Sequence, residues 1–142
     1  MTIDVRPLTP GTATGAPLRL DESLSFWGGF DATTGAIIDV HHPQRGETLT
    51  GRVLLMPAGR GSSSGSALLA EALRLGTAPA AIVLGRVDEI IALGAVVGEE
   101  LYGVGCPVVS VEGELPSVGG FSAAVVRSDP DAGRGELELR EG

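Results

Sequence analysis

The segment from Arg52 to Leu84, RVLLMPAGRGSSSGSALLAEALRLGTAPAAIVL, determines the fold class. It begins with the apolar run RVLLM, which Pro57 ends, and it finishes with the apolar run PAAIVL. Both runs are typical of buried strands. Between them, leucines and alanines recur at helical spacing from Leu68 to Leu75, and Gly76 is suited to end the helix. The segment therefore predicts a strand, a loop, a helix and a second strand parallel to the first.

The sequence after this segment continues the same alternation. Asp88 to Leu101 predicts a second helix, although Gly94 and Gly98 weaken it, and Pro107 to Val111 predicts a third buried strand. The further β candidates are Ala16 to Leu20, Ala36 to Val40, Phe121 to Arg127 and Gly135 to Arg140. Strands and helices in this order predict an α/β fold, with the flanking strands in a second sheet or barrel-like layer.

The length and composition fit one domain over residues 1–142. The chain has 142 residues, 43% of them hydrophobic, and only five aromatic residues, so its core is built mainly from Ala, Val, Ile and Leu. Residues 1–15 contain two prolines and two glycines and are expected to form a loose or edge-strand lead-in.

The charged residues and the single cysteine exclude several classes of function. All ten basic residues are arginine, which excludes lysine-dependent chemistry, and a net charge of -8 argues against nucleic acid as a partner. No apolar run is long enough to cross a membrane, and the first residues do not resemble a signal peptide. Cys106 by itself cannot form an internal disulfide or hold a metal cluster, so a reducing, cytoplasmic setting is expected.

The loop from Ala58 to Ser66, AGRGSSSGS, is the strongest candidate site. It follows a buried strand and precedes a helix, the position where α/β folds bind ligands. Its glycines allow close approach of the backbone, its serines offer hydroxyls, and Arg60 adds a positive charge suited to a carboxylate. The loop therefore predicts a small-anion site in which a serine could also act as a base, whereas the alternative is a loop that only caps its helix.

Two other features allow two interpretations each, and a third allows one. The segment SFWGGFD, Ser25 to Asp31, is either a hairpin that fills the core or a hydrophobic patch that closes over a site or docks a partner. His41 and His42, near Asp39, are either a metal site or a surface turn with one ring packed locally. The lone Cys106, before Pro107, has the position of a small core residue.

Two blocks of the sequence resemble a known family. The stretch LSFWGGFDATTGAIIDVHHPQRGETLTGRVLLMPAGRGSSSGS and the later stretch GTAPAAIVLGRVDEIIALGAVVGEELYGVGCPVV are similar to the swivel-domain small subunit of the aconitase X family. The resemblance covers about residues 16–111. It implies a swivelling β/β/α domain similar to the fourth domain of aconitases.

The same resemblance implies a function and a set of site residues. It implies the small subunit of a two-subunit hydro-lyase, in which Ser62 is the base that removes the proton alpha to the substrate carboxylate. Arg60, Gly61 and Ser63 would line the substrate pocket. The partner large subunit would carry an iron–sulfur cluster or other metal, and this chain would bind none alone.

The identity of the substrate stays open at this point. Bacterial members of the family resemble cis-3-hydroxy-L-proline dehydratases, which form a pyrroline-2-carboxylate, and archaeal members resemble mevalonate 5-phosphate dehydratases. The lysine-free, arginine-rich composition and the GRGSSSGS form favour the hydroxyproline branch. A non-catalytic subunit that binds an anion or serves in assembly is the alternative from another class.

Overall fold

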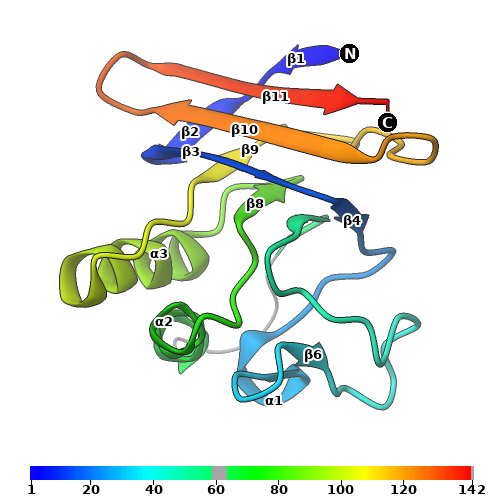
Figure 1. Cartoon of the computed structure of the whole chain (residues 1–142), viewed down its shortest axis with the longest axis vertical. Coiled ribbons are helices and arrows are strands. Elements are labelled where there is room, and N and C mark those ends of the chain that lie inside the picture. Colours follow the sequence, from blue (N-terminus) through cyan, green and yellow to red (C-terminus); the bar gives the residue numbers. More distant parts are fainter. Residues whose placement is uncertain (59–63, 142) are drawn as a thin grey trace.

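The chain forms three layers, two β-sheets and a layer of helices, as the computed structural model shows (Figure 1). The structure describes residues 1–58 and 64–141. An outer sheet packs on one face of a central sheet, and the helices cover the other face. This arrangement confirms the predicted α/β fold class.

The outer sheet is antiparallel and joins the two ends of the chain. Among the described residues it has four strands in the order β1-β11-β10-β3. Their bounds are Thr2–Asp4 (β1), Gly11–Gly15 (β3), Ala123–Asp129 (β10) and Arg134–Arg140 (β11). The two C-terminal strands are the longest of the sheet and form its centre, so the N-terminal strands add to its two edges.

The central sheet is mostly parallel, with the order β2-β9-β8-β7-β4 in the described part of the chain. Its strands are Arg6–Thr9 (β2), Pro17–Arg19 (β4), Val53–Met56 (β7), Ala81–Leu84 (β8) and Val108–Ser110 (β9). Strands β4, β7, β8 and β9 are parallel, and β2 pairs with β9 antiparallel. The four parallel strands therefore end at the same edge of the sheet.

The unbroken apolar runs of the sequence are explained by burial on both faces of the central sheet. In β7, Val53 and Leu55 face the outer sheet, and Leu54 and Met56 face the helices. The strand β8 alternates in the same way. Because neither face meets water, these strands show no alternation of polar and apolar residues, as is typical of a covered parallel sheet.

Two helices connect the parallel strands and lie on one face (Figure 1). They are α2, Ser64–Leu75, between β7 and β8, and α3, Glu89–Tyr102, between β8 and β9. Both connections step in the same direction along the sheet, and parallel connections are almost always right-handed, so both helices fall on the same side. Asp88 caps α3 by accepting hydrogen bonds from the backbone N–H groups of Ile90 and Ile91.

The glycines of α3, which weaken the helix locally, allow it to pack closely on α2. A Cβ atom on Gly94 would lie 2.8 Å from the carbonyl oxygen of Ser66 and 3.1 Å from the Cβ of Leu69. A Cβ atom on Gly98 would lie 3.2 Å from the Cβ of Leu73. The absence of side chains at these two positions is therefore a requirement of helix packing.

A short aromatic unit packs beside α2. It consists of α1, Phe26–Gly29, followed by the hairpin of β5, Phe30–Asp31, and β6, Ala36–Ile37. The rings of Phe26 and Phe30 are both buried and meet edge to face, with centroids 5.2 Å apart. The predicted strand from Ala36 to Val40 is thus shorter than expected, since Ile38 and Val40 are exposed.

The expectation of a loose lead-in over residues 1–15 is wrong, whereas the edge-strand alternative is right. The lead-in forms β1 and β3 at the two edges of the outer sheet and β2 at one edge of the central sheet. Pro7 lies in β2, where an edge strand tolerates a residue without an N–H group. None of the helices in the described part of the chain is long and apolar enough to cross a bilayer.

Candidate functional site

A cavity of about 390 Å³ opens where the parallel strands of the central sheet end. We call it the carboxyl-edge cavity; it is lined by Arg19, Pro57, Gly85, Arg86, Glu112, Gly113, Glu114 and Leu115. These residues are the last of β4 and those that follow β7, β8 and β9. In open α/β sheets, ligands bind beyond the carboxyl ends of the parallel strands.

The floor of the carboxyl-edge cavity is held by backbone hydrogen bonds around Gly85. The N–H of Gly85 donates to the carbonyl of Met56 at 3.0 Å, and the N–H of Gly113 donates to the carbonyl of Gly85 at 2.9 Å. A Cβ atom on Gly85 would lie 2.7 Å from the carbonyl oxygen of Pro57. A residue with a side chain would therefore force apart the segments that follow β7, β8 and β9.

Among the described residues, four charged side chains line the carboxyl-edge cavity, and two of them already have partners. Nη1 of Arg19 donates to the carbonyl of Pro116 at 3.2 Å. A carboxylate oxygen of Glu112 lies 3.6 Å from Nη1 of Arg6. Arg86 and Glu114 are exposed and form no ion pair with any residue in the described ranges. Arg86 and Glu114 are thus available to a ligand, whereas Arg19 keeps its positive charge beside a neutral carbonyl.

The backbone at Glu112 is strained. Its φ is +58°, and it is the one non-glycine residue with positive φ among those described. Its N–H donates to Oγ of the fully buried Ser110 at 3.3 Å. Backbone strain of this kind persists only where the surrounding structure enforces it, and it is concentrated at ligand sites. The turn after β9 is therefore fixed in a defined shape at the wall of the cavity.

The predicted site residues Arg60, Gly61, Ser62 and Ser63 lie outside the described residues. Their neighbours on both sides are described: Ala58, which follows β7 and is buried, and Ser64, the first residue of α2. The predicted context of the loop, between a buried strand and a helix, is thereby confirmed. The loop departs from the same edge as the carboxyl-edge cavity, since Pro57 lines that cavity.

The start of α2 is packed between the aromatic unit and α3. A Cβ atom on Gly65 would lie 3.8 Å from Cγ2 of Ile90 and 4.0 Å from Cβ of Phe26. Trp27, the next residue after Phe26, is 59% exposed. The core-filling interpretation of the aromatic segment is therefore right for its phenylalanines, whereas Trp27 presents a large apolar side chain to solvent.

The histidine pair forms a surface turn with one packed ring, as the second interpretation predicts. His42 is 5% exposed; its Nδ1 accepts from the N–H of Gln44 at 3.0 Å, and its Nε2 lies 3.2 Å from the carbonyl of Glu22. These contacts assign the proton to Nε2. The ring of His42 is thus committed to backbone groups, and His41 is exposed.

Cys106 is a core residue, as predicted. Its side chain is 1% exposed, and its Sγ lies 3.6 Å from the carbonyl of Pro79. Burial raises the pKa of the Cys106 thiol to about 12. Within the described residues, no group of three His, Cys, Asp or Glu side chains is placed to hold a metal ion.

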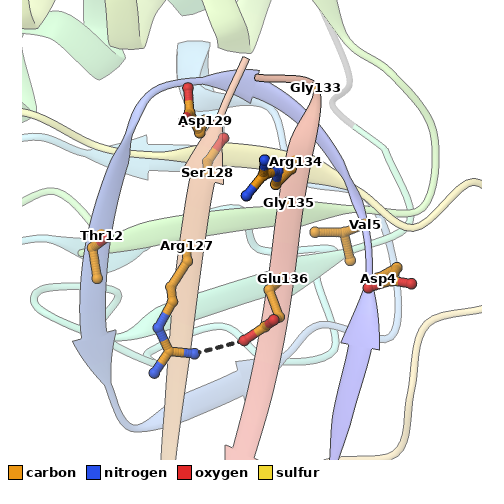
Figure 2. Close-up of a pocket in the computed structure, with 10 residues that line it drawn as sticks. All are labelled: Asp4, Val5, Thr12, Arg127, Ser128, Asp129, Gly133, Arg134, Gly135 and Glu136. Atoms are coloured by element: carbon orange, nitrogen blue, oxygen red, sulfur yellow. Dashed lines mark hydrogen bonds and ion pairs between the residues drawn. The ribbon is translucent and has the colours of Figure 1, made fainter. Parts of the chain in front are cut away.

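A second cavity, of about 580 Å³, lies at the end of the outer sheet where the β10–β11 hairpin passes β1 (Figure 2). It is lined by Asp4, Val5, Thr12, Arg127, Ser128, Asp129, Gly133, Arg134, Gly135 and Glu136. Nη1 of Arg127 donates to Glu136 at 2.9 Å, drawn as the dashed line in Figure 2. The central sheet separates this cavity from the helices, so it is remote from the start of α2.

Arg86 and Glu114 line the carboxyl-edge cavity but were not predicted from the sequence. Both follow predicted buried strands, and the rule that ligands bind beyond the carboxyl ends of parallel strands would have directed attention to them. Their residue types gave no signal, because an isolated arginine or glutamate in a loop is usually a solvated surface residue.

Comparison with known proteins gives consistent matches over most of the chain. A family model described as the aconitase X swivel domain matches residues 2–133. The cis-3-hydroxy-L-proline dehydratase of Pseudomonas aeruginosa is 50% identical over 103 residues, which cover 72% of this chain and 18% of that protein. The phosphomevalonate dehydratase small subunit of Methanothermobacter thermautotrophicus is 43% identical over 96 residues, which cover 68% of this chain and 73% of that subunit.

The fold of this chain is also similar to that of a solved structure from the same family. The crystal structure of Thermococcus kodakaraensis aconitase X in its holo-form contains a chain that superposes with a TM-score of 0.79 at 30% identity, and the match covers 99% of each chain. The present chain therefore spans less than a fifth of the Pseudomonas dehydratase but nearly the whole of this archaeal chain. The predicted family is confirmed: the chain belongs to the aconitase X swivel-domain family.

Proposed function

We propose that this chain is the swivel part of a two-part hydro-lyase and that it supplies the base which dehydrates cis-3-hydroxy-L-proline. The observation that carries the proposal is the 50% identity to the Pseudomonas protein of that name, over a region that includes the strand, loop and helix around Ser62. The chain then works with a large aconitase X subunit, and residues 1–142 act as one domain.

In this proposal Ser62 removes the proton from C2, the carbon that bears the carboxylate. The electron pair of the broken C–H bond forms the C2–C3 double bond as hydroxide leaves C3, which gives a pyrroline-2-carboxylate and water. Arg60, Gly61 and Ser63 bind the substrate beside Ser62 and stabilise the negative charge that develops at the carboxylate. The support is the sequence of this loop and the position from which it departs, at the carboxyl edge of the central sheet.

A metal centre that assists the departing hydroxide would be held by the partner subunit and not by this chain. Cys106 is the chain's single cysteine, and it is buried with a raised thiol pKa, whereas a cluster needs several accessible thiolates. An iron–sulfur cluster or other metal on the large subunit would supply Lewis-acid chemistry. We place the protein in the cytoplasm, since its single cysteine has no partner within the chain for a disulfide.

The substrate mevalonate 5-phosphate is the second candidate. It is favoured by the 43% identity to a phosphomevalonate dehydratase small subunit and by the match to the Thermococcus kodakarensis protein of that name, which covers 99% of this chain and 98% of that subunit. We place it second because the matched identity to the hydroxyproline enzyme is higher.

The test is reconstitution of the two parts. The chain is expressed alone and with a large aconitase X subunit, and dehydration of cis-3-hydroxy-L-proline and of mevalonate 5-phosphate is measured. Activity is expected only from the pair and only on the hydroxyproline. Ser62→Ala should lower kcat by about 10²- to 10⁴-fold, as is usual for loss of a general base.

Ser122→Ala is the matched control, because Ser122 is exposed and precedes β10 in the outer sheet, away from the helices. It should retain wild-type activity. Full activity of Ser62→Ala would refute the role of Ser62 as base. A pair that is inactive on both substrates would favour the non-catalytic, anion-binding alternative.

A further inference from the structure

We propose that the carboxyl-edge cavity binds the zwitterionic part of an amino-acid or imino-acid substrate, with Arg86 on its carboxylate and Glu114 on its ammonium group. The inference rests on the proposed function and assigns two residues that the loop around Ser62 does not include. It starts from the position of the cavity, at the edge where β7 leads toward that loop.

Two charged side chains of the cavity, one of each sign, have neither a hydrogen bond nor an ion pair to any described residue. Arg19 is held by the carbonyl of Pro116, and Glu112 is paired with Arg6. Arg86 and Glu114 line the same cavity without an ion pair to any described residue. A ligand with one carboxylate and one ammonium group satisfies both, through charge-assisted hydrogen bonds.

The start of α3 does not compete for the carboxylate. Helix N-termini bind anions through unpaired N–H groups, but here Oδ1 of Asp88 accepts from Ile90 at 2.9 Å and from Ile91 at 3.2 Å. This carboxylate also places a negative charge at the helix start. Arg86, two residues before the cap, is therefore the group of this segment that can hold a substrate carboxylate.

Glu114 is held in position by its neighbours. Gly113 bonds to the carbonyl of Gly85, and Leu115 is 5% exposed and packs in the core between the two sheets. The backbone on both sides of Glu114 is thus anchored while its carboxylate stays at the cavity. A ligand therefore has to order only the side chain of Glu114, because its backbone is already held.

An imino acid matches both charges that have no partner in this cavity. A phosphate dianion would meet Arg86 and Arg19, but it would also meet Glu114, and like charges at close range lower affinity. An imino acid such as hydroxyproline brings a single negative charge together with a positive one. Glu114 is therefore the residue of this cavity that distinguishes a ligand with an ammonium group from one without.

The test uses the reconstituted pair with the variants Arg86→Gln and Glu114→Gln. Both side chains are exposed, so the variants should fold, which thermal unfolding checks. Arg86→Gln should raise KM for cis-3-hydroxy-L-proline about 10- to 100-fold, and Glu114→Gln should raise it by about 10-fold, the usual effect of one charge-assisted hydrogen bond. The value of kcat should change by less than about threefold, since both residues act in binding.

Competitive inhibitors separate the two roles. L-proline carries both charges, whereas tetrahydrofuran-2-carboxylate lacks the ammonium group. The wild-type pair should prefer L-proline, Glu114→Gln should abolish that preference, and Arg86→Gln should weaken both inhibitors. Arg45→Gln and Glu141→Gln are matched controls at exposed positions outside the cavity and should leave KM unchanged.

The outcomes distinguish this inference from the proposed function. If the wild-type pair dehydrates hydroxyproline but both cavity variants keep the wild-type KM, the cavity assignment is wrong and the function stands. If the wild-type pair is inactive on hydroxyproline, the function is wrong, and NMR titration of the 142-residue chain with L-proline decides the cavity. Shifts at residues 86 and 114 that both variants lose would support the site, and the absence of shifts in the wild type would overturn it.

Discussion

Replacement of Gly94 by alanine should destabilise the protein, although alanine is the better helix former. Gly94 lies in the middle of α3 and faces α2. A Cβ atom there would lie 2.8 Å from the carbonyl oxygen of Ser66 and 3.1 Å from its Cα. Both contacts are with backbone, which cannot rotate away, so the two helices would have to separate.

Helix propensity and steric crowding act in opposite directions on the stability of Gly94→Ala. Alanine instead of glycine in a helix interior contributes about 1 kcal/mol of stability. Inserting a methyl group into a closely packed region costs about 1 to 3 kcal/mol, and contact with backbone places this site at the upper end. The net loss for Gly94→Ala is thus about 1 to 2 kcal/mol. At Gly98 the contacts are with the side chain of Leu73, which can move, so Gly98→Ala should lose less.

The assay is urea unfolding followed by far-UV circular dichroism, with the free energy of unfolding and the m-value taken from each curve. Val96→Ala is the matched control, because Val96 is in the same helix but is 42% exposed. It should be neutral or slightly stabilising. A second test pairs Gly98→Ala with Leu73→Ala, and a positive coupling is expected because the smaller residue makes room for the new methyl group.

A stabilising effect of Gly94→Ala would contradict this prediction. If Gly94→Ala raises the free energy of unfolding by about 1 kcal/mol, the full gain in helix propensity has been realised. In that case α2 and α3 do not meet at Gly94. Close packing of α2 on α3 would then not explain the glycine at position 94.

Two predictions concern protonation. The thiol of Cys106 is buried with a pKa of about 12, so a thiol reagent at pH 8 should label it only after urea unfolds the chain. The free energy of unfolding should also fall as pH rises above 9, because the unfolded thiol ionises there and the folded one does not. Rapid labelling of the folded chain would contradict this. Hydrogen bonds from Arg140 and Arg127 lower the pKa of Glu138 to about 2, so its contribution to stability is present above pH 4.5 and is lost as pH falls toward 2. Glu138→Gln should flatten the dependence of stability on pH in that range, and an unchanged dependence would exclude Glu138 as its source.

The buried centre of the fold was predictable because its signals are local. The runs at β7, β8 and β9 are apolar without alternation, and α2 has helical spacing. Each of these patterns is set by burial of neighbouring residues in the chain. The loop before α2 was predictable as a candidate site for the same reason, since its place between a strand and a helix is a property of the local sequence.

The edge strands were not predictable in detail because their partners are distant in the sequence. Thr2–Asp4 pairs with Arg134–Arg140, at the other end of the chain, and Gly11–Gly15 pairs with Ala123–Asp129. These segments contain glycine, threonine and few large apolar residues, so their local preference for a strand is weak. Their conformation is determined by hydrogen bonds that exist only after the outer sheet assembles.

The sequence by itself determined the α/β class and the order of the central strands and helices along the chain, and it predicted the serine loop as a candidate anion site. Only the tertiary structure decided that Arg86 and Glu114 line one cavity and that Gly94 and Gly98 serve helix packing. The physical reason is distance along the chain. Burial and helical spacing are encoded over a few residues, whereas a cavity and a helix contact are made by side chains that meet only when separate elements pack together.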